Sequence, residues 1–150
     1  MAFGAAVSGG STGGFLALRD EQQCPCGSGE RFDGCCAPLL RGDEAAPSAE
    51  RLMRSRYTAF VVGDARYLRE TWHPGTRPEA LDLDPSLRWS GLEITDVEAG
   101  VDGDRRGAVE FRAHWRDGDA TGVLAERSRF VRQSGRWWYL DGAVSKTGPS

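Results

Sequence analysis

All four cysteines of the chain lie within one segment of thirteen residues, with a spacing that could bind a metal ion. Cys24 and Cys26 form one pair, and after an interval of eight residues Cys35 and Cys36 form the other. Zn²⁺ binds thiolates in closed tetrahedral sites with zinc–sulfur distances of about 2.3 Å. Three glycines in the interval favour the sharp turn that would bring the pairs together. The spacing therefore predicts a structural Cys₄ zinc site.

Two other uses of the four thiols remain open. A disulfide between Cys35 and Cys36 would close a strained ring, because neighbouring Cα atoms lie closer than disulfide geometry prefers. A bridge across the loop, such as Cys24–Cys35, requires an oxidising compartment. An iron–sulfur cluster also takes four thiolates, although its usual spacings contain C-x₂-C runs. Zinc is the interpretation that the spacing favours.

The segment CPCGSGERFDGCC resembles the SEC-C metal-binding motif, C-x-C-x₈-C-C/H, named for the C-terminus of the SecA translocation ATPase. The resemblance implies zinc as the cofactor and suggests a link to protein-export or ribosome-associated machinery. Members of that family usually carry several lysines between the cysteine pairs. This chain has Glu30, Arg31, Phe32 and Asp33 there. All four ligands are retained, so zinc is still expected, but the loop gives no reason to expect an acidic partner.

The composition narrows the class of protein. The 150 residues carry a net charge of −3, which argues against a nucleic-acid-binding role. No stretch approaches the roughly 18 apolar residues of a membrane span, and the first fourteen residues lack the basic start and apolar run of a secretion signal. Cysteines confined to a metal-like cluster fit a reducing compartment. We expect a cytoplasmic protein that does not bind membranes.

The chain divides into a small metal-binding segment and one larger domain. We expect a disordered tail at 1–20, the zinc knuckle at 21–40 and a linker at 41–47. Residues 48–142 have the length of one domain with its own core. The polar residues 143–150 are expected to form a second tail.

Two helices are expected at the start of this domain. Ser48 can cap the first helix and Gly63 can end it, with an apolar face formed by Leu52, Met53, Tyr57, Phe60 and Val61. On the same helix we expect Glu50, Arg51 and Arg54 to be solvated. Asp64 can cap a second, shorter helix that ends before the His73–Pro74 pair.

The remainder of the domain is predicted to form antiparallel strands. Strands are expected at 87–99, where broken alternation indicates a bulge, and at 108–116, 121–132 and 136–141. Asp117–Gly118 and Ser134–Gly135 are typical of hairpin turns. Helices followed by such a meander predict an α+β fold, in which two to three helices pack on a curved antiparallel sheet and leave a concave pocket.

A second resemblance covers most of the chain. The segments SAERLMRSRYTAF, YLRETWHPGTRP, WSGLEI, ERSRFVR and GRWWYLDG resemble the YchJ-like family of uncharacterised bacterial proteins. That family joins a SEC-C knuckle to a cone-shaped α+β domain similar to nuclear transport factor two. The resemblance implies this fold and a possible homodimer through the open face of the sheet. It implies no biochemical activity.

Candidate pocket residues come from the helices and from the strand faces that point inward. Glu126 shares a strand face with Leu124, Ser128 and Phe130, where an unpaired carboxylate is costly. It is either paired with an arginine (Arg56, Arg77 or Arg127), solvated on a twisted strand, or a pocket acid or base with a raised pKa. The predicted pocket set is Tyr57, Trp72, His73, Arg77, Trp115, Glu126 and Ser128.

Two functions follow as hypotheses, and no catalytic motif favours a particular reaction. A closed Cys₄ site leaves no coordination position for a substrate. This favours an adaptor that binds a protein partner through a zinc-stabilised knuckle. The alternative is an enzyme or a small-molecule-binding protein that uses the concave pocket.

Overall fold

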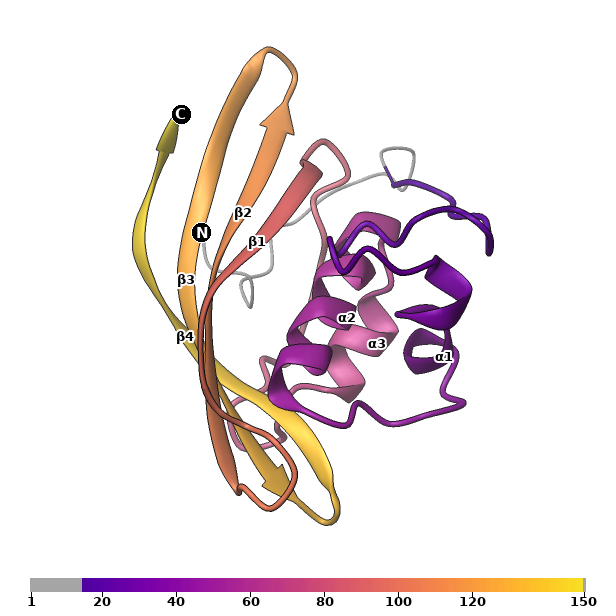
Figure 1. The fold of residues 1–150 in the computed structure, drawn as a ribbon. Helices are drawn as coiled ribbons and strands as arrows, with labels where there is room; N and C mark the ends of the chain where they lie inside the picture. Colours follow the sequence, from indigo (N-terminus) through magenta and orange to yellow (C-terminus); the bar gives the residue numbers. More distant parts are fainter. Residues whose placement is uncertain (1–14, 150) are drawn as a thin grey trace.

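The computed structural model describes residues 15–149, with side chains for residues 15–144, and arranges them in three layers. A four-stranded sheet forms one outer layer, and helices α2 (Ala49–Val62) and α3 (Ala65–Glu70) pack against one of its faces. The cysteine segment and helix α1 (Ala37–Leu40) cover α2 from the other side (Figure 1). The expected α+β fold is confirmed.

The caps predicted from the sequence set the bounds of both longer helices. The Oγ of Ser48 accepts a hydrogen bond from the backbone N–H of Arg51 at 3.1 Å, and Gly63 ends α2 with a φ of 77°. The Oδ1 of Asp64 accepts from the N–H of Tyr67 at 3.0 Å and starts α3. The helix–helix corner is therefore encoded locally.

The sheet is an antiparallel meander in the order β1-β2-β3-β4. Its strands are β1 (Arg88–Ala99), β2 (Arg106–Asp117), β3 (Ala120–Gln133) and β4 (Arg136–Pro149). The expected irregularity in β1 is present, because its register with β2 shifts between Trp89 and Gly91 and again between Ile94 and Asp96. Such bulges increase local twist and bending, and the sheet in Figure 1 curves around the helices.

Two glycines attach the start of α2 to the sheet. The N–H of Ala49 donates to the carbonyl of Gly100 at 2.9 Å. A Cβ added to Gly107 would lie 2.6 Å from the Cα of Gly100 and 3.1 Å from the Cβ of Ala49. The backbones of β1, β2 and α2 can approach this closely only without side chains at these positions.

The structure differs from the sequence prediction at both expected tails. Residues 143–149 continue β4, with Ala143 opposite Arg127 and Pro149 opposite Gly122 on β3. The polar composition of this segment concealed the strand, because pairing with β3 satisfies the backbone whatever the side chains are.

The part of the N-terminal tail that the structure describes packs on the domain. The N–H of Leu16 donates to the carbonyl of Val61 at 3.2 Å, and Leu18 contacts the core. Residues 1–14 of the predicted disordered tail lie outside the described residues. None of the described helices combines the length and apolar character needed to cross a membrane.

Candidate metal centre

The four cysteine sulfurs converge on one point between the knuckle (residues 21–40) and α2. They all lie within 4.8 Å of one another, and all four residues are buried. The Sγ of Cys35 is 3.6 Å from that of Cys26 and 4.0 Å from that of Cys36. The four thiols are free, and these separations are too long for a sulfur–sulfur bond.

The donor set fits a tetrahedral ion. A metal–sulfur distance of about 2.3 Å in a tetrahedron implies sulfur–sulfur separations of about 3.8 Å, and the separations of Cys35 from Cys26 and from Cys36 are 3.6 and 4.0 Å. No carboxylate or histidine belongs to the cluster in the part of the chain that the structure describes. The four cysteines could hold one metal ion.

Local backbone hydrogen bonds bring the two cysteine pairs together. The N–H of Cys24 donates to the carbonyl of Glu30 at 2.9 Å, and the N–H of Phe32 donates to the carbonyl of Gln22 at 2.8 Å. A single 3₁₀ turn, Phe32–Gly34, then leads into Cys35. Between the two pairs, Gly27 and Gly29 have φ values of 81° and 86°, which only glycine adopts readily.

Hydroxyl groups contact the sulfurs from both sides. The hydroxyl of Thr58 on α2 lies 3.4 Å from the Sγ of Cys36, to which it donates, and 3.7 Å from the Sγ of Cys24. The Oγ of Ser28 lies 3.1 Å from the Sγ of Cys35. Donors of this kind orient thiolate ligands and disperse their charge. Sequence reasoning did not identify Thr58, because its role depends on the knuckle covering this side of α2.

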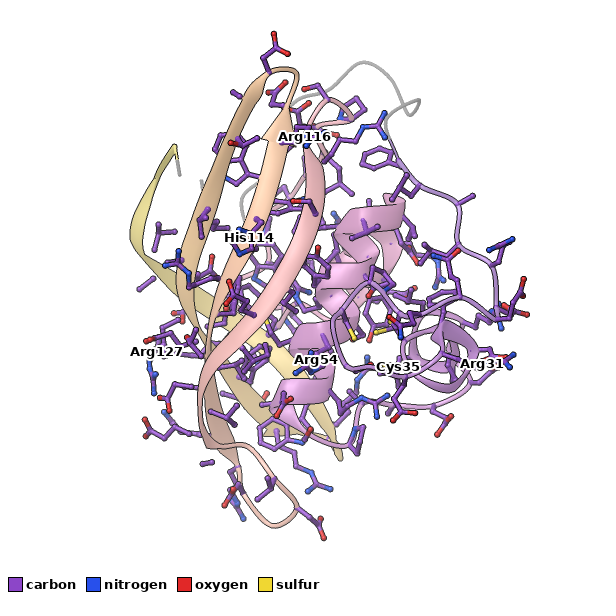
Figure 2. All side chains as sticks on the ribbon, turned by 45° about the horizontal axis from the view of Figure 1, so that its top comes forward. Arg31, Cys35, Arg54, His114, Arg116 and Arg127 are labelled. Atoms are coloured by element: carbon purple, nitrogen blue, oxygen red, sulfur yellow. The ribbon has the colours of Figure 1, made fainter. Side chains whose placement is uncertain are left out.

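Arg51 and Arg54 are not solvated as expected but hold the knuckle to α2. The guanidinium of Arg54 donates to the carbonyl of Cys26 at 2.7 Å, and that of Arg51 donates to the carbonyl of Cys35 at 3.0 Å. Figure 2 shows Arg54 and Cys35 on facing sides of this junction. The two cations also offset the charge of a tetrathiolate site. The expectation was wrong because α2 is covered on two sides, by the sheet and by the knuckle.

Contacts among the sulfurs shift the pKa values of the thiols in different directions. The hydrogen bond with Cys26 raises the pKa of Cys24 to about 11. Hydrogen bonds with Cys24 and then Cys26 also raise the pKa of Cys36, whereas the contact with Cys24 lowers the pKa of Cys26. Several thiolates this close repel one another, so a bound cation would be needed to deprotonate all four.

Glu126 belongs to a buried polar network and not to an open pocket. Its side chain is fully buried, and its Oε2 accepts from the hydroxyl of Ser128 at 2.7 Å and from that of Tyr139 at 3.4 Å. Arg56 stacks on the ring of Tyr139 at 4.3 Å and donates to the hydroxyl of Thr71 at 2.7 Å. Burial lowers the pKa of Arg56 to about 10, an effect that Tyr139 and Glu126 oppose.

Of the three arginines considered as partners for Glu126, Arg56 is buried in the same network and interacts electrostatically with Glu126. Arg127 points to the opposite face of the sheet, where it pairs with Asp96 and Glu98. Sequence reasoning could have favoured Arg56, because it lies four residues after Leu52 and four before Phe60 on the apolar side of α2.

The other predicted pocket residues are dispersed. Trp72 is buried against Tyr139, with ring centroids 5.1 Å apart, and Arg77 donates to the carbonyl of Trp72. His73 lies at the surface and contacts Gln133. Tyr57 is buried beside the backbone of Gly91, and Trp115 is half-buried on β2. Two described cavities, one beside α1 and one beside the β1–β2 bend, are lined by none of the seven residues.

Comparisons with known proteins agree with this architecture. A family model described as "YchJ, middle NTF2-like domain" matches residues 48–142. The chain belongs to the YchJ-like family. The resemblance noted in the sequence is thereby confirmed, and the matched residues coincide with the domain from the cap of α2 into β4.

YchJ-like relatives match over most of their length. A UPF0225 protein of Streptomyces coelicolor is 56% identical over 119 residues, covering 79% of this chain and 93% of the relative. The solution structure of a SEC-C motif containing protein from Rhodopseudomonas palustris is 35% identical, with a TM-score of 0.71, and covers 82% of this chain and 98% of the other. The crystal structure of a SEC-C motif containing protein from Psychrobacter arcticus is 28% identical, with a TM-score of 0.68, and covers 85% of each chain.

Proposed function

We propose that this protein is a zinc-binding adaptor of the bacterial cytoplasm, in which a structural zinc ion holds the knuckle in the shape that a protein partner recognises. The observation that carries the proposal is the closed arrangement of four buried sulfurs against α2. Such a site satisfies all four zinc coordination positions with protein ligands, and so it favours a structural role over a catalytic one. Bound zinc would cross-link the two ends of the knuckle.

The chemistry of the donor set supports zinc. Tetrahedral thiolate sites select zinc or iron–sulfur clusters, and the observed separations suit a single ion better than the larger volume of a cluster. Free thiols of this kind persist in a reducing compartment, which supports the cytoplasm.

The surfaces available to a partner support an adaptor role. The tip of the knuckle exposes Glu30 and Arg31, which are not ligands. No other layer of described residues covers the face of the sheet opposite the helices (Figure 1), and this face could serve a protein partner or a second copy of the chain. The enzyme alternative has less support, because the two described cavities are lined by none of the seven candidate pocket residues.

Elemental analysis of untagged protein purified without chelator tests the zinc proposal, with Cys24→Ser as the variant. We expect about one zinc per wild-type chain, with four thiols that react only after denaturation or chelation. The variant should lose most of its zinc and open the knuckle while the domain stays folded. A metal-free wild type, an iron–sulfur spectrum or a variant with a full equivalent of zinc would contradict the proposal.

Crosslinking in a bacterial lysate tests the adaptor role. The matched variant reverses two exposed charges, Glu30→Lys with Arg31→Glu, and leaves the net charge and all ligands unchanged. We expect a partner that the wild type captures and that both this variant and Cys24→Ser lose. Equal capture by all three proteins would contradict recognition through the knuckle, and size-exclusion light scattering would separate a second copy from a different partner.

A further inference from the structure

A cavity of about 290 Å³ lies where the knuckle meets the domain, apart from the metal centre. One wall comes from α1 and the linker that follows it, and the other walls come from α2, α3 and the start of β4. Its size is at the lower end of the range for small-molecule sites. An occupant would therefore be a small molecule in contact with both parts of the chain.

Three apolar side chains border the interior of this junction cavity, together with the polar side chains of Tyr67 and Thr71. Leu39 of α1, Leu52 of α2 and Trp137 of β4 line it, and all three side chains are at most 4% exposed. The indole N–H of Trp137 has no acceptor among the described residues. A buried donor without an acceptor is costly. This side of the interior fits an apolar group.

Charges of opposite sign lie on different walls. Arg136 is exposed at the start of β4, and its guanidinium stacks on the ring of Trp138 at 4.5 Å without an ion pair in the described structure. Asp43 and Glu44 are exposed on the linker, and they too form no ion pair with a described residue. The remaining charges of the lining, Arg66 and Glu70, neutralise each other at 2.9 Å.

We propose that the junction cavity binds a free α-amino acid with an apolar side chain. The ammonium group faces Asp43 and Glu44, the carboxylate faces Arg136, and the side chain lies on Leu39, Leu52 and Trp137. A simple anion would be repelled by the two carboxylates, and a simple cation would be repelled by the arginine. A zwitterion matches both walls. This binding is independent of the proposed adaptor role.

Nuclear magnetic resonance titration of the ¹⁵N-labelled protein with L-leucine, L-methionine and L-phenylalanine tests the proposal. We expect saturable shifts in the Trp137 indole N–H and in the backbone amides of residues 43 and 44 for at least one of the three. N-acetyl-leucine and leucine amide, each with one charge removed, should bind more weakly than leucine. Absence of saturable shifts with all three amino acids, or equal binding of the single-charge analogues, would overturn the proposal.

Matched variants locate the site. Arg136→Gln should weaken binding about tenfold or more, because it removes a charge-assisted hydrogen bond to the carboxylate. Asp43→Asn combined with Glu44→Gln should do the same at the ammonium end. The control is Arg116→Gln, which removes an equal charge from the far end of β2 (Figure 2) and should bind like the wild type. Wild-type affinity in Arg136→Gln would overturn the assignment.

Discussion

Glu126 is an acidic residue whose surroundings, and not its type, define its role. Hydroxyl groups of Ser128 and Tyr139 donate to its Oε2, so the carboxylate is stabilised inside the core. Gly142 on β4 leaves room for it, because a Cβ there would lie 2.1 Å from that oxygen and 3.0 Å from the hydroxyl of Tyr139. A glycine in a strand often marks such a close approach, and here the approach is to a buried carboxylate.

Gly142→Ala should therefore destabilise the protein. The added methyl group would displace Glu126 from its hydroxyl partners, and overpacking of this kind lowers the free energy of unfolding by about 1–3 kcal/mol. Urea denaturation followed by circular dichroism measures the change. Gly91→Ala is the control, because its Cβ would meet only a ring carbon of His114 at 3.6 Å. Equal destabilisation by both variants would contradict the inference that Gly142 leaves the room that Glu126 needs.

Thr58→Val should weaken metal binding without changing the shape of α2. The substitution removes the hydroxyl that contacts Cys36 and Cys24, and the loss of such an outer contact typically costs 10–100-fold in affinity. Competition with a zinc chelator measures the affinity. Thr121→Val, at an exposed position of β3, is the control. Unchanged affinity in Thr58→Val would show that this hydroxyl does not support the ligands.

At the scale of elements, α2 connects the two parts of the chain. Its N-terminus attaches to the β1–β2 bend through Gly100 and Gly107. One side packs on the sheet, and the other carries the arginines that bond the knuckle. A helix buried on two sides does not show a single apolar face, so α2 combines buried Ser55, Arg56 and Thr58 with apolar residues.

Arg54→Ala should loosen the knuckle while leaving the sheet intact. It removes a hydrogen bond of 2.7 Å to the carbonyl of Cys26 from a side chain that is only 16% exposed, and hydrogen bonds to charged groups contribute about 1.5–3 kcal/mol. Hydrogen exchange should show faster exchange at the amides of residues 24–36. Arg69→Ala, which removes a similar bond to the carbonyl of Glu79, is the control. Unchanged exchange in Arg54→Ala would contradict the inference that Arg54 holds the knuckle on α2.

At the scale of the whole molecule, one core runs from the sheet through α2 into the knuckle. Cys26 and Cys36 have no exposed surface and belong to the same buried cluster as Phe111 and Phe130 of the sheet. All three tyrosines of the chain lie in this cluster, at positions 57, 67 and 139. Burial raises the pKa of each above its ordinary value of 10.0, because it disfavours the phenolate.

Tyrosine ionisation should therefore accompany alkaline unfolding. A group whose folded pKa is raised contributes its full stability below the unfolded pKa, near 10, and loses it as pH rises further. Absorbance at about 295 nm and near-ultraviolet circular dichroism, recorded against pH, should change together in a single step above pH 10. A tyrosine that titrates near pH 10 while the circular dichroism remains native would contradict the inference that all three tyrosines lie in one buried core.

The sequence by itself determined the features that depend on neighbouring residues. Ser48, Gly63 and Asp64 fixed the helix bounds through capping, and the Ser134–Gly135 turn, with φ values of 55° and 76°, closed the last hairpin. The cysteine spacing indicated one site, because short glycine-rich loops have few ways to place four sulfurs.

Tertiary structure alone decided which surfaces meet. The knuckle covers α2, and this contact turned Arg51, Arg54 and Thr58 from surface residues into supports of the metal centre. The polar residues 143–149 form a strand because they pair with β3. Packing of the core places Glu126 beside hydroxyl groups and not in a pocket. These outcomes depend on residues distant in sequence, and local propensity and periodicity carry no information about such contacts.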